Sequence, residues 1–189
     1  MKLFLYATVL FFIGSCATPS NKEKTKKTTD SIIIVQANKI TEYAKTITSK
    51  ELKEHLYNYA SEEFQGRKVG SKGQKLAAEY LRNYYIAENI SSPYGGTQYF
   101  QTVPKSYLGN EYNDSQNVLA YIKGSDKPEE IIVISAHLDH KGTNSEGLIY
   151  YGADDDGSGT VAMLEIAQAF KKAQNDGFGP RHSVLFLHA

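Results

Sequence analysis

The spacing of apolar residues along the chain follows two periods, and the longer period predicts three helices. Leu52, Leu56 and Tyr59 recur at intervals of four and three residues, which indicates a helix over residues 49–60. A capping-box pattern that begins at Thr48 marks its start. Glycine-rich residues then interrupt the helical pattern before it resumes.

Two further stretches keep the helical period. A second capping box at residues 71–74 precedes an apolar face that runs to about residue 88. After a Gly- and Ser-rich segment, apolar residues recur every three positions from Val161 to Phe170, which indicates a third helix. A β-branched run at residues 31–35 predicts either a short strand or the start of a helix.

Shorter apolar stretches predict the strands of a sheet. Residues 99–103 alternate and stop at a proline, and residues 117–123, 131–136 and 183–187 follow. The last two runs are continuously apolar and enclose the third helix, as in a βαβ unit. We therefore expect an α/β fold with a mixed, largely parallel sheet flanked by helices. The last strand is expected to lie at an open edge of this sheet and to promote aggregation.

The first residues have the pattern of a targeting segment. Lys2 precedes an apolar stretch, residues 3–13, that is too short to span a bilayer. Small residues follow, and then Cys16, so that this end resembles a bacterial lipobox. The resemblance predicts a signal peptide over residues 1–15, lipidation of Cys16 and a tether over residues 16–30.

Lipidation of Cys16 would anchor the protein to a membrane of the bacterial cell envelope. A general signal peptide cut near Ala17 is the alternative. The remaining residues, 31–189, are expected to form part of one domain, and a single cysteine leaves that domain without an intrachain disulfide. The chain has 21 basic and 21 acidic residues, and this balance argues against a nucleic-acid partner.

Candidate chemistry begins where the strand at residues 131–136 ends. Alternation along the chain puts His137 and Asp139 on one side and Leu138 on the other. A neutral imidazole binds Zn²⁺, and it binds better when a carboxylate holds its other ring nitrogen. His137 and Asp139 therefore have the chemistry of a ligand and its orienting group. An ordinary polar strand end is the alternative, because a spacing of two residues is a weak signal.

Three adjacent carboxylates, Asp154, Asp155 and Asp156, lie between glycines just before the third predicted helix. Such charges repel one another unless a cation or solvent separates them. Helix capping is one explanation for one or two of them, because a helix N-terminus favours negative charge. A calcium loop is another, although the EF-hand pattern is absent. A carboxylate that bridges two metal ions in a hydrolase is the third.

Together the two motifs carry a family resemblance. Ser-Ala-His-Leu-Asp-His at residues 135–140 precedes Gly-Ala-Asp-Asp-Asp-Gly-Ser-Gly-Thr at residues 152–160. In this order they resemble the co-catalytic di-zinc aminopeptidase family, a metallopeptidase family that also contains glutamate carboxypeptidase and the glutaminyl cyclases. Residues 63–73 and 117–121 resemble upstream segments of that family. The resemblance extends from about Ile40 to Ala189.

The resemblance implies a role for each site residue. His137 is a ligand of one zinc ion, Asp139 is the carboxylate that orients His137, and Asp155 bridges the two ions. Asp154 and Asp156 are then loop or cap residues. The choice of Asp155 among the three acids rests on the family pattern and not on spacing.

The implied function of the intact protein is that of a zinc aminopeptidase that binds two Zn²⁺ ions and hydrolyses N-terminal residues of peptides. A glutaminyl cyclase with one zinc ion, or a non-catalytic domain of the same fold, are alternatives. The Glu-Glu pair of the family, and a further Asp and His, have no counterpart before Ala189. His140, His182 and His188 are not expected to replace them. We therefore expect the chain to be the N-terminal part of a longer enzyme and to be inactive alone.

Overall fold

The computed structural model describes residue 26 and residues 37–189. The unit Lys39–Ala189 carries the sheet, the main helices and the candidate site. The predicted signal peptide, Cys16, the run at residues 31–35 and the tether apart from residue 26 lie outside the described residues. Among the residues that are described, no helix combines the length and the apolar character needed to cross a membrane.

Three long helices form where the period predicts them, and capping residues fix two of their starts. Helix α2 spans Ser49–Tyr59, and the Thr48 hydroxyl accepts a hydrogen bond from the Glu51 amide. Helix α3 spans Lys72–Ala87, and Ser71 caps it in the same way. Helix α5 spans Ser158–Asn175. All three predicted helices are confirmed.

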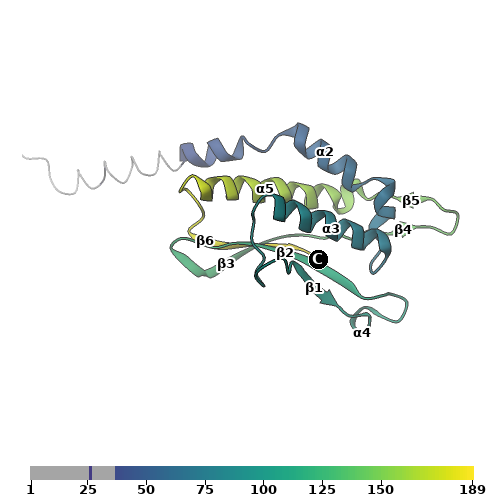
Figure 1. Ribbon diagram of the computed structural model, residues 1–189. Helices are drawn as coiled ribbons and strands as arrows, with labels where there is room; N and C mark the ends of the chain where they lie inside the picture. Colours follow the sequence, from purple (N-terminus) through teal and green to yellow (C-terminus); the bar gives the residue numbers. More distant parts are fainter. Residues whose placement is uncertain (1–25, 27–36) are drawn as a thin grey trace, which may run out of the picture. The chain divides into compact units, whose positions relative to one another are not determined.

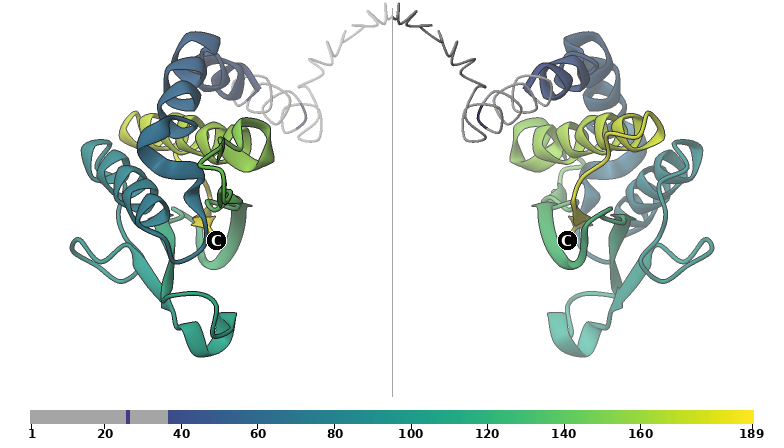
Figure 2. Two further views of the ribbon diagram at one scale, coloured as in Figure 1. Left: turned by 90° about the vertical axis from the view of Figure 1, so that its right-hand side faces the viewer. Right: turned by 90° about the vertical axis from the view of Figure 1, so that its left-hand side faces the viewer.

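The main sheet has four strands in the order β1-β2-β6-β3. Strand β1 spans Phe100–Val103, β2 spans Ser115–Ile122, β3 spans Lys127–Ala136 and β6 spans His182–His188. Helices α2, α3 and α5 lie together on one side of this sheet (Figure 1), and the turned views of Figure 2 show the same arrangement. The predicted α/β class, with a mixed sheet flanked by helices, is confirmed.

Pairing within the sheet differs from the expected parallel majority. Strand β3 pairs with β6 in parallel, whereas β1 pairs with β2, and β2 with β6, in antiparallel fashion. The reason is connectivity. Only β3 and β6 are joined by a helical crossover, through α5, which a parallel pair requires. Strands β1 and β2 are joined by a loop that contains the short helix α4, Lys105–Leu108.

The position of the last strand is also corrected. Strand β6 lies between β2 and β3, and its Val184 and Phe186 are fully buried. The edge strands are β1 and β3, and on β3 the residues Ile131, Ile132 and Val133 are each more than half exposed. Sequence order does not reveal this, because β6 inserts between two strands that precede it in the chain.

Short elements complete the unit around the site. They are the helical turn η1 at Glu62–Arg67, strand β4 at Gly142–Thr143, strand β5 at Ile149–Tyr150 and the turn η2 at Ala153–Gly157. Strands β4 and β5 form a small antiparallel ribbon. The core packs side chains of α2, α3 and α5 against β2 and β6, and Leu138 is buried within it.

Candidate metal site

The candidate site lies where β3 ends and α5 begins. Backbone hydrogen bonds tie the end of β3 to the end of β6: the Leu138 amide donates to Ala189 O at 2.8 Å, and the Ala189 amide donates to Ala136 O at 3.2 Å. The Thr160 hydroxyl of α5 donates to His137 O at 3.0 Å. The sheet and the helix thus fix the backbone on which the first motif lies, as is expected at strand ends of an open α/β sheet.

The predicted alternation at this strand end is present. Leu138 is fully buried, while the side chains of His137 and Asp139 are 43% and 31% exposed. His137 Nδ1 lies 3.2 Å from Asp139 Oδ1 and 3.1 Å from the Asp139 carbonyl oxygen. Both contacts hold the ring by the same nitrogen, which leaves Nε2 free to face the second motif.

The second motif places its three acids differently. Asp156 caps α5, because its carboxylate accepts hydrogen bonds from the amides of Gly159 and His137, each at 3.2 Å. The Asp154 side chain forms no hydrogen bond or ion pair with any described residue. Asp155 Oδ1 lies 3.1 Å from His137 Nε2. The structure therefore brings His137, Asp139 and Asp155 together in one row, with the ring between two carboxylates.

His140 lies nearer to the site than the sequence indicated. Its Nδ1 is 3.5 Å from Asp155 Oδ2, and only 10% of its side chain is exposed. Burial lowers the pKa of His140, although Asp155 opposes this shift. For His137, burial also lowers the pKa, but Asp139 and Asp155 more than offset it and the pKa is raised above its ordinary value. Protonated His137 is thus stabilised by two carboxylates, and a metal ion would compete with that proton.

The donor set fits part of a zinc site. Two ligands of one tetrahedral Zn²⁺ ion lie roughly 3.3 Å apart when each is about 2 Å from the metal, and His137 Nε2 and Asp155 Oδ1 are separated by 3.1 Å. No group of three or more His, Cys, Asp or Glu side chains suited to a metal ion occurs among the described residues. His137 and Asp155 therefore supply two donors, and a closed site needs more.

Arg67 is a component of the site that the motifs do not indicate. It is buried behind the site, with 1% of its surface exposed, and its side chain bonds to backbone on both motif loops. The available signal was its position in residues 63–73, the upstream segment of the family resemblance. The hydrogen-bond partners of Arg67 were not indicated by the sequence, because all of them are backbone carbonyls.

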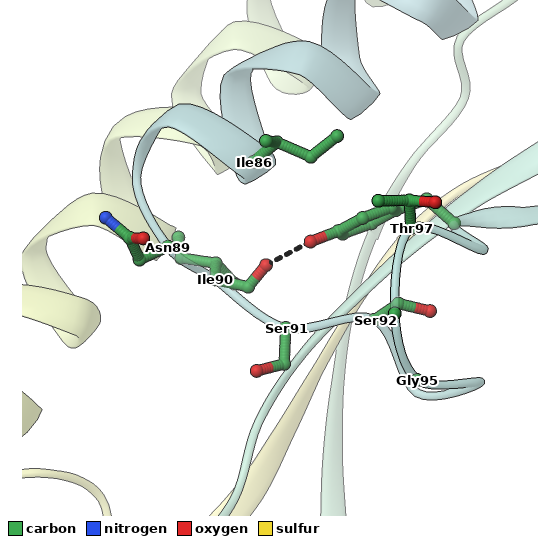
Figure 3. Close-up of a pocket in the computed structure, with 9 residues that line it drawn as sticks. Ile86, Asn89, Ile90, Ser91, Ser92, Gly95 and Thr97 are labelled. Atoms are coloured by element: carbon green, nitrogen blue, oxygen red, sulfur yellow. Dashed lines mark hydrogen bonds between the residues drawn. The ribbon is translucent and has the colours of Figure 1, made fainter.

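A separate hollow of about 310 Å³ lies at the C-terminal end of α3 (Figure 3). Ile86, Ile90 and Tyr99 line it together with serines and glycines of the following loop. The Tyr99 hydroxyl donates to Ile90 O at 2.6 Å, the bond drawn in Figure 3. None of the predicted site residues lines this hollow, so it is distinct from the candidate metal site.

Comparison with known proteins agrees with the motifs. Residues 117–189 match the family model described as Peptidase family M28. A probable glutamate carboxypeptidase of Arabidopsis thaliana is 31% identical over 84 residues, which cover 44% of this chain and 11% of that protein. The predicted resemblance to a metallopeptidase family that includes glutamate carboxypeptidase is confirmed, and the matched residues contain both motifs.

Solved structures show the same fold. A leucine aminopeptidase precursor of Bacteroides thetaiotaomicron aligns with a TM-score of 0.55 and 17% identity, over 75% of this chain and 46% of that one. A glutaminyl cyclase of the same organism aligns with a TM-score of 0.57 and 18% identity, over the same shares. The chain thus spans less than half the length of these relatives.

Proposed function

We propose that this chain carries the first half of the active site of a zinc-dependent exopeptidase, an aminopeptidase that hydrolyses N-terminal residues of peptides. One observation carries the proposal: His137 Nε2 faces Asp155 Oδ1 at 3.1 Å, while Asp139 holds the opposite nitrogen of the same ring. This is the arrangement of two metal ligands and an orienting carboxylate. The match of residues 117–189 to a peptidase family supports it.

His137 and Asp155 would hold zinc, which polarises a substrate carbonyl and acidifies water when it is bound in such a site. Asp139 would hold a proton on His137 Nδ1, so that in the neutral ring the lone pair lies on Nε2, the nitrogen that would bind zinc beside Asp155. Asp155 is 66% exposed, and its second oxygen faces His140. That exposure leaves the carboxylate accessible from solvent, and a metal ion held there would be accessible to a peptide substrate.

The experiment measures release of free amino acids from short peptides by the purified full-length protein, with zinc and with a chelator. Asp155→Asn is expected to lower kcat/KM at least 100-fold, because the amide is a poor zinc ligand. Asp154→Asn is the matched control within the same loop and is expected to retain activity. Equal activity of the two variants, or a wild-type protein that holds zinc and cleaves no peptide, contradicts the proposal.

A glutaminyl cyclase is the second candidate, and the fold it shares with the cyclase of Bacteroides thetaiotaomicron favours it. The same preparation separates the two candidates when a peptide with N-terminal glutamine is supplied. An aminopeptidase releases free glutamine, whereas a cyclase releases ammonia and leaves a pyroglutamyl peptide. Zinc content gives a second criterion, with two ions expected for the aminopeptidase and one for the cyclase. A zinc-free protein with neither activity would indicate a non-catalytic domain.

Anchoring at Cys16 belongs to the same proposal, with the catalytic domain held at a membrane of the bacterial cell envelope. The supporting observation is the apolar segment that ends in small residues before Cys16. Cys16→Ser is expected to move the protein from the membrane fraction to the soluble fraction of cells. Detection of a diacylated N-terminal cysteine by mass spectrometry tests the modification directly. A mature protein that begins near Ala17 without lipid contradicts it.

A further inference from the structure

The two motif loops meet at a buried arginine that belongs to neither. Arg67 ends η1, and the three residues Gln65, Gly66 and Arg67 have positive φ values of 49°, 67° and 51°. Three consecutive residues with positive φ, two of them not glycine, are uncommon, and such geometry persists only where the surroundings enforce it. This turn directs the Arg67 side chain into the protein, where 1% of it is exposed.

The guanidinium of Arg67 donates to four backbone carbonyls on three segments. Nε donates to Leu138 O at 3.0 Å, between the two residues of the first motif. Its two terminal nitrogens donate to Tyr151 O at 2.9 Å and Gly152 O at 2.8 Å, at the start of the second motif. A further bond of 2.9 Å reaches Tyr59 O on α2. One planar group therefore joins the loop of His137 to the loop of Asp155.

The surroundings of this guanidinium explain how its charge is tolerated. No carboxylate of the described residues forms an ion pair with Arg67. Its guanidinium carbon lies 4.5 Å from the centroid of the Tyr59 ring, a cation–π contact. The Tyr59 hydroxyl donates to Leu138 O at 2.9 Å, the carbonyl that also accepts from Arg67. Charge-assisted hydrogen bonds to several carbonyls are strong and directional, so this cluster resists rearrangement.

Two glycines permit this close approach. A Cβ atom on Gly152 would lie 2.8 Å from an Arg67 terminal nitrogen and 2.5 Å from the His140 ring. A Cβ atom on Gly66 would lie 2.4 Å from Gly142 O and 2.6 Å from Tyr150 O. Both glycines also have positive φ. The contacts of Arg67 are therefore built into the backbone on both sides of the site.

We propose that Arg67 is a positioning residue that sets the separation of His137 and Asp155, and through it the zinc affinity of the site. The part of this inference that concerns zinc affinity rests on the proposed function, whereas the part that concerns the separation of His137 and Asp155 does not. Lysine is not equivalent here, because one ammonium cannot reach four carbonyls on three segments in the geometry of a planar fork. Changes to groups that orient metal ligands typically weaken metal binding 10- to 100-fold.

The test compares Arg67→Lys with Arg82→Lys in the full-length protein. Arg82 lies on α3, pairs with Glu79 and is partly exposed, so it serves as the matched control. Amide hydrogen exchange of the zinc-free protein is measured at His140, whose amide donates to Arg67 O, and at Gly157, whose amide donates to Gly152 O. We expect exchange at these two amides to be at least tenfold faster in Arg67→Lys and unchanged at Ala120 of the central sheet. Zinc affinity, measured by competition with a chelator, is expected to fall at least tenfold.

Unchanged exchange at His140 and Gly157, or an equal increase at Ala120, overturns the proposal, since the second result indicates a general loss of stability. If wild-type protein binds no zinc while the local exchange result holds, the proposed function fails and the positioning role is supported. Should Arg67→Lys not fold, Tyr59→Phe takes its place, because it removes one of the two donors to Leu138 O. It is expected to increase exchange at His140 about threefold, and no increase there overturns the proposal.

Discussion

Two buried charged side chains, Arg67 and Glu165, each contact a residue of helix α2, and their hydrogen bonding differs. Each of the three guanidinium nitrogens of Arg67 donates at least one hydrogen bond to a backbone carbonyl. Glu165 of α5 is 1% exposed, and its Oε1 lies 3.2 Å from His55 Nε2 of α2, but Oε2 has no hydrogen-bond partner among the described residues. The nearby Tyr84 hydroxyl of α3 also has no hydrogen-bond partner within the part of the chain that the structure describes.

The difference shows what a buried polar group contributes in each case. A satisfied network fixes one geometry and resists change, whereas an unsatisfied atom costs free energy without fixing anything. Burial raises the pKa of Glu165 and lowers the pKa of His55, so both shifts favour the neutral forms of this pair. The Arg67 cluster supports the candidate site, and the Glu165 cluster joins three helices at a cost in stability.

Removing the arginine should give the largest effect. Arg67→Met deletes every donor of the guanidinium. Leu138 O keeps the Tyr59 hydroxyl and Gly152 O keeps the Gly157 amide, so the cost of about 1–3 kcal/mol for each buried group that loses its partner adds only in part. We expect the free energy of unfolding, measured with urea, to fall by at least about 3 kcal/mol. Arg82→Met is the surface control, with an expected change within about 0.5 kcal/mol. Similar losses in the two variants would show that Arg67 does not hold the loops.

A third buried polar group, His188 of β6, gives a prediction about pH. Burial lowers the pKa of His188 to about 3. Its Nε2 shares a hydrogen bond of 2.7 Å with the Tyr85 hydroxyl, while Nδ1 has no partner in residue 26 or residues 37–189. Because the unfolded chain takes up this proton near pH 6.5 and the folded protein does not, stability falls as pH decreases below about 6.5 toward 3. The slope is at most about 1.4 kcal/mol per pH unit from this group.

His188→Gln is expected to remove that part of the slope, as measured by urea unfolding at several pH values. His182→Gln, on the same strand but with 34% of its side chain exposed, is the matched control. A slope that persists in His188→Gln would assign the pH dependence to other groups.

Replacing Glu165 should change the free energy of unfolding less than Arg67→Met does, and in the opposite direction. Glu165→Gln keeps the volume and the contact with His55, and it removes the buried charge. Since the pKa of Glu165 is raised in the folded protein, the wild type loses stability as pH rises through that pKa. We expect the variant to be more stable than wild type by about 1 kcal/mol at pH 8 and by less at pH 5. Glu54→Gln on the exposed side of α2 should change neither value, and a destabilised Glu165→Gln would show that the carboxylate is better satisfied than its contacts indicate.

The smallest change in stability is expected at the exposed edge of the sheet. Ile132 of β3 is 53% exposed, so Ile132→Lys should alter the free energy of unfolding by no more than about 0.5 kcal/mol. A charge on an open strand edge opposes edge-to-edge pairing, and light scattering of this 189-residue chain should therefore show slower aggregation. Tyr107→Lys on helix α4, where the side chain is 88% exposed and lies outside the strands of the sheet, is the control. Equal protection by both variants would indicate a general effect of charge.

The fold could be predicted from the sequence to the extent that local patterns decide it. The spacing of Leu52, Leu56 and Tyr59 and the cap at Thr48 give α2, and similar signals give α3 and α5. The order of strands could not be obtained in this way, because the place of β6 between β2 and β3 depends on which faces and edges pack together. The two-residue strands β4 and β5 are too short to have a period of their own.

The sequence by itself determined the chemistry of this protein: the residue types and order of His137, Asp139 and Asp155, and the strand and helix on which they lie. Only the tertiary structure decided that Asp155, and not a neighbouring acid, faces the ring of His137. It also decided that Arg67 joins the two loops. The physical reason is that motif residues are recognised by side-chain type at short spacing, whereas Arg67 acts through backbone carbonyls 71 and 85 positions away. Every residue has such a carbonyl, so no pattern of residue types reveals which ones it will bind.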